Sequence, residues 1–156
     1  MKINVEQLTK IYGNSHPYIA RTKLNQGKLY FKTKEFKKAK KLLSRVNREY
    51  QQIFPPDHPR TSDPHLQLGL LYLETDEREK ADQHLKKTYI IRTQGYPADS
   101  WRVAQTMNVY STYLSEQQQF SEADSLLVQG YENLRKNPGC IRPVHSRGGK
   151  SNYLTL

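Results

Sequence analysis

Histidines, a lone cysteine and a glycine-rich lysine motif are the parts of this 156-residue chain that could take part in chemistry. A metal site on a helix needs two ligands three or four residues apart, so that both lie on one face. No histidine here has another histidine, a cysteine or a carboxylate at that spacing with a consistent partner elsewhere. The histidines are His16, His58, His65, His84 and His145. The sequence therefore predicts no metal site and no cofactor.

The motif Gly-Gly-Lys-Ser at 148–151 matches only the end of a phosphate-binding loop. Val144 stands where that loop requires a glycine, and no strand precedes it. The paired acids Glu77 and Glu79 lie where a helix is expected to start, a position at which carboxylates favour the helix dipole. No nucleophile and base stand out together, so we expect a protein without catalytic activity.

Composition limits the class of protein further. Hydrophobic residues make up 35% of the chain, charged residues 26%, and the formal charge is +10. No apolar run approaches the roughly 18 residues of a membrane span, and the first segment lacks the apolar stretch of a signal peptide. Cys140 is the only cysteine, which excludes an internal disulfide. We expect a cytoplasmic protein with a thin core and no integral membrane contact.

A repeat of 42 residues organises the chain. The blocks 16–57, 58–99 and 100–141 align without a gap, and their columns agree where packing would demand it. Small residues recur at Gly27, Gly69 and Ser111; large apolar residues at Tyr30, Tyr72 and Leu114; alanines at Ala39, Ala81 and Ala123; and leucines at Leu43, Leu85 and Leu127. Each block carries two patterns of apolar residues at helical spacing. These patterns predict helices near 17–32, 35–53, 64–74, 77–94, 100–116 and 119–136.

Several residues at the predicted helix ends have a local interpretation. His16 and His58 occupy one column before a helix, which favours a structural role in that turn. Asp63 followed by Pro64 suggests an N-cap and first helical residue, and Ser100 is an N-cap candidate. We expect the small residue of each first helix, such as Gly27, to face the alanine of the second helix. Gly130 interrupts the last helix, where we expect fraying.

The columns resemble those of the tetratricopeptide repeat, which has glycine or alanine, then tyrosine three residues later, then alanine twelve after the first. The 42-residue period, with His-Pro at the block start, resembles the repeats of kinesin light chains and related bacterial arrays. HEAT-type repeats share the period but do not predict this triplet. The resemblance implies an all-α solenoid of antiparallel helix pairs, wound as a right-handed superhelix, that serves as a non-catalytic scaffold for protein binding.

The predicted repeats do not fill the chain. Residues 1–15 are interpreted as a partial repeat with only its second helix, and Ile3, Val5, Leu8 and Ile11 are expected to cover the open side of the first block. Full repeats follow at 16–57, 58–99 and 100–138. Residues 139–156 contain Pro143 and three glycines but no acid, which predicts a basic, disordered tail. This organisation suggests a truncated array or a piece of a longer protein.

Charge is concentrated in the first block. Residues 16–57 hold eleven basic and three acidic side chains, whereas each later block is slightly acidic. The predicted basic surface consists of Lys37, Lys38, Lys40, Lys41, Arg45 and Arg48. The groove positions implied by the resemblance are Arg21, Leu24, Asn25, Lys28, Phe31, Lys32, Leu66, Gln67, Leu70, Leu73, Gln105, Asn108 and Thr112.

Three hypotheses for function follow. The leading one is a scaffold that binds an acidic peptide in the concave groove, where side-chain amides hold the peptide backbone and cations set the preference. The first alternative is nucleic-acid binding through the basic surface of the first block. The second is a regulatory fragment of a larger signalling protein. The oligomeric state stays open.

Overall fold

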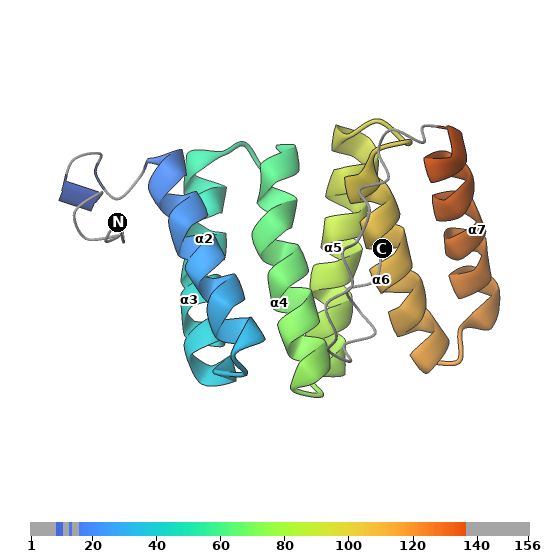
Figure 1. Cartoon of the computed structure of the whole chain (residues 1–156), viewed down its shortest axis with the longest axis horizontal. Coiled ribbons are helices and arrows are strands. Elements are labelled where there is room, and N and C mark those ends of the chain that lie inside the picture. Colours follow the sequence, from blue (N-terminus) through green and yellow to red (C-terminus); the bar gives the residue numbers. More distant parts are fainter. Residues whose placement is uncertain (1–8, 11–12, 14–15, 137–156) are drawn as a thin grey trace. The chain divides into compact units, whose positions relative to one another are not determined.

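The computed structural model describes residues 9–10, 13 and 16–136 (Figure 1). In these ranges the protein contains α-helices and one short 3-10 helix but no strand, which confirms the all-α prediction. The elements are α2 (Pro17–Lys32), α3 (Phe36–Ile53), the 3-10 helix η1 (Pro59–Thr61), α4 (Ser62–Glu74), α5 (Arg78–Gly95), α6 (Trp101–Glu116) and α7 (Phe120–Lys136). The predicted tail lies outside the described residues, and so does nearly all of the predicted partial repeat.

Side chains cap the first helices of the first and third repeats. The Nδ1 atom of His16 accepts a hydrogen bond from the backbone N–H of Tyr18, and Ser100 accepts one from Arg102. The predicted cap at Asp63 is wrong, because η1 begins four residues earlier and its N-cap is His58. The chain passes from η1 directly into α4 at Ser62, so Asp63 lies inside the first turn of α4.

The turn inside each helix pair has the same geometry in all three repeats. Lys34, Asp76 and Gln118 occupy one column and have φ values of 60°, 57° and 63°. The residue after each of them donates a backbone hydrogen bond to the carbonyl five residues earlier, as Glu35 does to Tyr30. This is the bonding of a Schellman motif, which closes a helix with a left-handed residue. No glycine marks these turns in the sequence.

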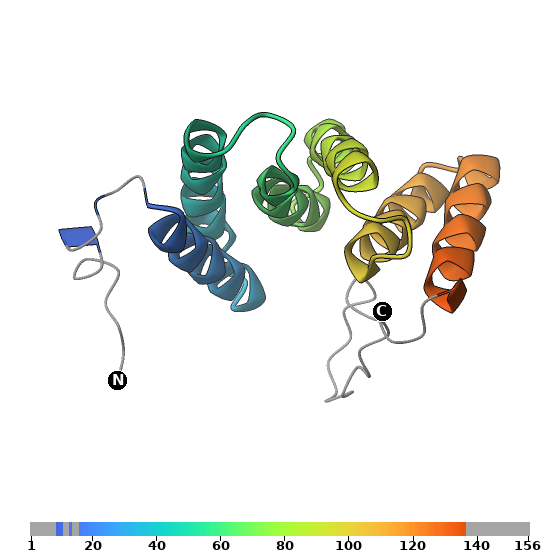
Figure 2. The ribbon, with the colours of Figure 1, turned by 90° about the horizontal axis from the view of Figure 1, so that it is seen from above.

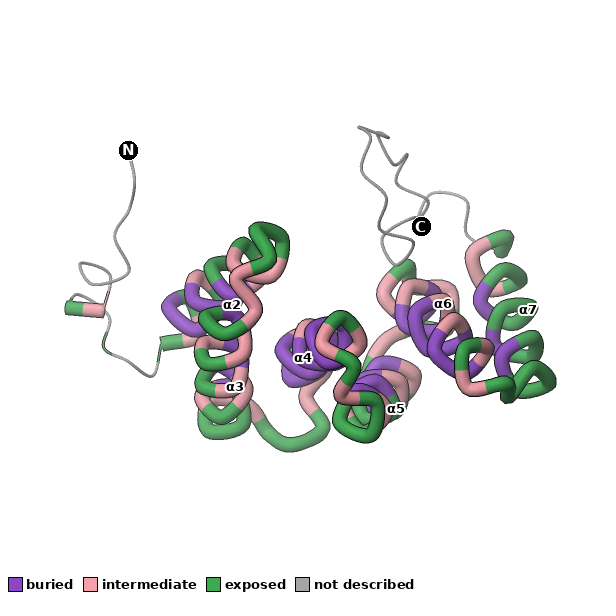
Figure 3. Tube along the Cα trace, turned by 90° about the horizontal axis from the view of Figure 1, so that it is seen from below, coloured by how far each residue is buried: buried purple, intermediate pink, exposed green. Residues whose placement is uncertain are grey.

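The described chain divides into two compact units, with the boundary between Lys87 and Thr88 inside α5. Unit 1 contains α2, α3, η1, α4 and the first part of α5. In this unit α4 packs against α3 and contacts α2 (Figure 2). Its core is formed by Ala20, Leu24, Ala39, Leu43, Val46, Tyr50, Leu68, Leu71, Tyr72 and Ala81 (Figure 3). The apolar faces that the sequence predicted for these helices are therefore the ones that are buried.

The small residues of unit 1 face leucines rather than alanines, which corrects the sequence expectation. A Cβ atom built on Gly27 would lie 2.6 Å from Cδ2 of Leu43, and one on Gly69 would lie 2.7 Å from Cδ2 of Leu85. These separations are shorter than van der Waals contact. Glycine at these two positions thus allows the paired helices to approach closely while the leucines stay fully buried.

Unit 2 contains the rest of α5 together with α6 and α7, which pack as an antiparallel pair. Gly130 does not fray α7, because the helix runs unbroken to Lys136. A Cβ on Gly130 would lie 3.3 Å from Cβ of Met107 in α6. The close approach of α6 and α7 explains the glycine.

Candidate peptide-binding surface

A polar stripe runs along α2 in unit 1. Arg21, Asn25, Lys28 and Lys32 are spaced four, three and four residues apart, so they share one face of the helix. Arg21, Asn25 and Lys32 are exposed, and Lys28 is half-buried. The helix buries Ile19, Ala20, Lys23, Leu24 and Gly27 on its other side. Because α2 contains no acidic residue, the stripe is positively charged.

Helix α4 continues this surface with a different character. Gln67, Leu70 and Glu74 stand in the same columns as Asn25, Lys28 and Lys32. Leu70 is buried, whereas the side chains of Gln67 and Leu73 are half-buried. The surface of unit 1 therefore changes from cationic on α2 to amide and apolar on α4, with the exposed acid Glu74 at the end of α4.

Some of the residues assigned to the groove lie in the core instead. Leu24 is 2% exposed and Leu66 is 3% exposed, so neither offers surface to a ligand. Phe31 is half-buried and packs against Phe36, with ring centroids 6.0 Å apart. Adjacent residues of a helix point about 100° apart, so Leu24 faces inward while Asn25 faces outward.

In unit 2 two of the assigned residues form hydrogen bonds with other residues of that unit. Gln105 accepts a hydrogen bond at its Oε1 atom from Nη1 of the buried Arg92, and Thr112 donates one to the carbonyl of Asn108. Asn108 stands in the column of Leu24 rather than that of Asn25, and it lines a groove between α6 and α7. Asn25 and Asn108 are therefore not equivalent.

The basic surface of α3 is partly neutralised. Lys38 pairs with Glu35, and Arg45 pairs with Glu49. The Nζ atom of Lys40 lies 2.7 Å from Oε1 of Glu77, just before α5. Lys40 and Lys80 both donate to Glu77, which lowers the pKa of its carboxyl to about 2.

Lys37, Lys41 and Arg48 form no ion pair within the described residues. Three of the six predicted cations are thus held by carboxylates, which reduces the charge that this surface offers to a polyanion.

Two polar pairs inside unit 1 were not apparent in the sequence. The buried Nζ of Lys23 lies 2.9 Å from Oε1 of Glu49, and Arg45 also donates to this carboxylate. The Nδ1 atoms of His65 and His84 lie 2.8 Å apart and share a hydrogen bond between α4 and α5. The members of each pair are 26 and 19 residues apart, so no helical spacing links them.

Burial and the neighbouring His84 and Lys87 lower the pKa of His65 to about 4, and burial also lowers the pKa of His84. The two rings are therefore neutral at physiological pH. His84 also stacks on the ring of Tyr72, at 5.5 Å between centroids. These contacts give both histidines a structural role in joining α4 to α5.

In the part of the chain that the structure describes, no group of three or more histidines, cysteines, aspartates or glutamates could hold a metal ion. None of the described helices combines the length and apolar character needed to cross a membrane.

The repeat geometry and the surface of unit 1 define a helical-repeat protein. Residues 18–94 match the family model described as tetratricopeptide repeat, which identifies this part of the chain as tetratricopeptide repeats. Tetratricopeptide repeats generally mediate protein–protein contacts and generally form a non-catalytic scaffold. No curated protein matches the sequence.

Solved structures of other proteins share the fold. BtubC (BKLC) from P. vanneervenii is 15% identical, with a TM-score of 0.74 over 94% of this chain and 60% of that chain. Two structures of Podosopora anserina kinesin light chain repeats, described as nearly identical and TPR-like, are each 18% identical. Their TM-scores are 0.70 and 0.69, over 85% and 90% of this chain and 65% and 67% of theirs. The chain thus spans about two thirds or less of the length of BtubC and of the first of these.

Proposed function

We propose that the chain is a protein-interaction scaffold, in which the α2 and α4 surface of unit 1 binds an acidic, extended segment of a partner protein. The observation that supports the proposal is the stripe of Arg21, Asn25, Lys28 and Lys32, which has no acidic neighbour on its own helix. Arg21 and Lys32 lie about 16 Å apart along the helix axis, a distance that about five residues of extended peptide span.

Each side chain of the stripe has a role in this proposal. The amide of Asn25 can both donate to and accept from a peptide backbone, and Gln67, in the same column of α4, offers a second amide. The cations attract carboxylates of the peptide, and the rigid helices hold them in place before binding. The half-buried Leu73 offers apolar contact on the α4 side. Preference for acidic segments therefore arises on α2, and apolar side chains of the peptide are accommodated on α4.

The test is a titration of the full chain with a short labelled peptide that carries three glutamates, the first two separated by three positions and the last two by two. A second peptide has glutamines in place of the glutamates. We expect the double variant Arg21→Glu with Lys32→Glu to bind the glutamate peptide about tenfold more weakly, because two exposed attractions become repulsions. The glutamine peptide should bind weakly to both proteins.

A matched control separates the site from net charge. The double variant Lys37→Glu with Arg48→Glu changes the charge equally, on exposed cations of α3 that form no ion pair within the described residues. It should keep the affinity for the glutamate peptide. Equal loss in both double variants would show attraction by net charge alone and would refute the α2 site. Binding of RNA at low salt that only the α3 variant abolishes would favour the nucleic-acid alternative instead.

A further inference from the structure

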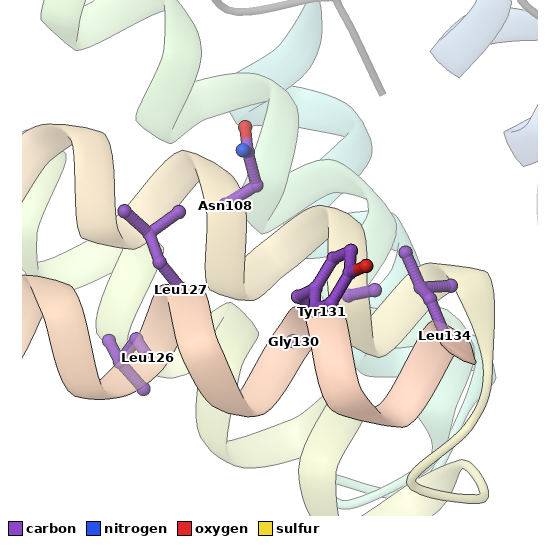
Figure 4. A pocket seen from close by; sticks show the side chains of 7 residues that line it. Asn108, Leu126, Leu127, Gly130, Tyr131 and Leu134 are labelled. Atoms are coloured by element: carbon purple, nitrogen blue, oxygen red, sulfur yellow. The ribbon is translucent and has the colours of Figure 1, made fainter. Parts of the chain in front are cut away.

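An apolar groove lies between α6 and α7 in unit 2, away from the α2 stripe in the sequence (Figure 4). Its volume is about 290 Å³, and Leu127, Tyr131 and Leu134 of α7 form one wall. Leu127 is 41% exposed and Tyr131 is 70% exposed. Asn108 of α6 is the polar side chain that lines it. Large apolar side chains seldom stay this exposed on a helix face unless something covers them.

The repeat shows what kind of element covers this face. The columns of Asn108, Leu127, Gly130 and Leu134 correspond, 84 residues earlier, to those of Leu24, Leu43, Val46 and Tyr50. All four of those earlier residues are buried in the core of unit 1, where α4 packs against α3. A helix with an apolar stripe is therefore the element that this face is built to accept.

Two positions of the groove carry smaller side chains than their counterparts in the first repeat. Gly130 replaces Val46 and Leu134 replaces Tyr50, so side-chain volume is missing where α4 would otherwise meet a full surface. Asn108 replaces Leu24 and adds an amide to the wall. The groove thus leaves room for the apolar side chains of such a helix, and Asn108 offers it a polar partner.

One repeat column has opposite charges in the first and last repeats, and this difference indicates the charge of the occupant. In the first repeat Lys40 reaches Glu77, three residues beyond the end of α4, at 2.7 Å. The residue in the Lys40 column of the last repeat is Asp124, which is exposed and lies one turn before Leu127 on α7. An acid in this column favours a cation where Glu77 stands.

We propose that the α6–α7 groove binds an amphipathic helix of another protein, with the helix's apolar stripe against Leu127, Tyr131 and Leu134. This helix carries a lysine or arginine just beyond its C-terminal end, next to Asp124. The site differs from the α2 stripe in both its residues and its ligand, since it takes a helix with a basic end rather than an acidic extended segment. It is therefore independent of the proposed function, and either can fail without the other.

The chain itself provides the probe. A labelled peptide of residues 58–77 contains the helix that covers the equivalent face in unit 1, and a second peptide carries Glu77→Lys. We expect the full chain to bind the lysine peptide about two- to fivefold more tightly than the glutamate peptide, the usual strength of one exposed ion pair. In the variant Asp124→Lys this preference should invert.

A pair of variants on α7 tests the apolar wall. Tyr131→Asp should weaken binding of the lysine peptide at least about tenfold, because it places a charge in the apolar groove. Val128→Asp is the matched control, since Val128 is 57% exposed on the same helix but does not line the groove. Circular dichroism would show that both variants keep their helices.

Four results would overturn the proposal. The first is absence of binding by both peptides, and the second is equal loss in Tyr131→Asp and Val128→Asp. The third is binding that appears only after removal of residues 137–156, which would make that segment the occupant. The fourth is a concentration-dependent dimer that Tyr131→Asp dissociates in sedimentation, which would make a second copy the occupant.

Discussion

The first and last helix pairs, α2–α3 and α6–α7, align column by column, but the residues in matching columns differ in how far they are buried. In the first pair Gly27 lies against Leu43, which is completely buried in unit 1. In the last pair the same two columns hold Ser111 and the exposed Leu127. The repeat therefore fixes where the helices lie, and the residues in each column decide whether a face becomes core or surface.

A second column shows that one buried position can hold very different residue types. Lys23, His65 and Met107 are equivalent residues of the first helices, and all three are buried. Lys23 is balanced by Glu49 and His65 by His84, whereas Met107 packs against Gly130 without a polar partner. One packing position thus accepts an ion pair, a neutral imidazole pair or a thioether, provided that each polar group finds a partner.

The largest loss of stability is expected from a larger side chain between α2 and α3. Gly27→Val should destabilise the fold by about 3 kcal/mol, because even a Cβ atom lies too close to the buried Leu43. Ser111→Val, in the same column of the last pair, should cost about 1 kcal/mol or less, since Ser111 already carries a side chain and loses one hydrogen bond. Urea unfolding of both variants gives the comparison. Equal costs would mean that the column is packed alike in the two pairs.

A smaller loss should follow when the ion pair of the first repeat is broken. Glu49→Ala leaves the buried Lys23 without its main partner and should lower the free energy of unfolding by about 2 kcal/mol. Adding Lys23→Met, the residue that the last repeat uses in this column, should recover most of that loss. A double variant no more stable than Glu49→Ala would show that the pair does not act through charge burial.

The smallest effect is the pH dependence of the histidine pair. The pKa of His65 is lowered from 6.5 to about 4 in the folded state, so the unfolded chain binds a proton first as the pH falls. Stability from this group is therefore complete above about pH 6.5 and is lost between pH 6.5 and 4, by about 1 to 2 kcal/mol at pH 5.

His65→Met should flatten this loss without removing it, because the pKa of His84 is lowered as well. The control His16→Asn, which exchanges one capping residue for another at an exposed helix start, should keep the full slope. Thermal unfolding between pH 7 and 5 measures both. An unchanged slope in His65→Met would contradict a neutral, buried imidazole at this position.

Most of the fold could be predicted from the sequence, because the apolar columns repeat every 42 residues and turn residues separate them. The predicted helix ends at 32, 53, 74, 116 and 136 agree with the structure. The expectation for Asp63 failed because a capping histidine started a 3-10 turn earlier. The expectation for Gly130 failed because intrinsic helix preference yields to packing, here against Met107.

The candidate surfaces were less predictable. The exposed Asn25 and the buried Leu24 are neighbours in the sequence. The resemblance to the repeat family does not decide, to the residue, which of them faces the groove. The neutralisation of Lys40 by Glu77 joins residues 37 positions apart, which no helical spacing indicates. Alignment of the three blocks puts Asn108 in the column of Leu24 and Leu66. This alignment alone could have shown that Asn108 and Asn25 occupy different columns.

The α2 stripe is tested most directly by mapping the glutamate peptide on the isotope-labelled full chain with nuclear magnetic resonance. The account predicts that the backbone amide signals of Asn25, Lys28 and Gln67 shift as the peptide is added, whereas those of Lys37 and Arg48 on α3 do not. Shifts confined to α3, or to Leu127 and Tyr131 on α7, would contradict binding of the acidic segment by unit 1.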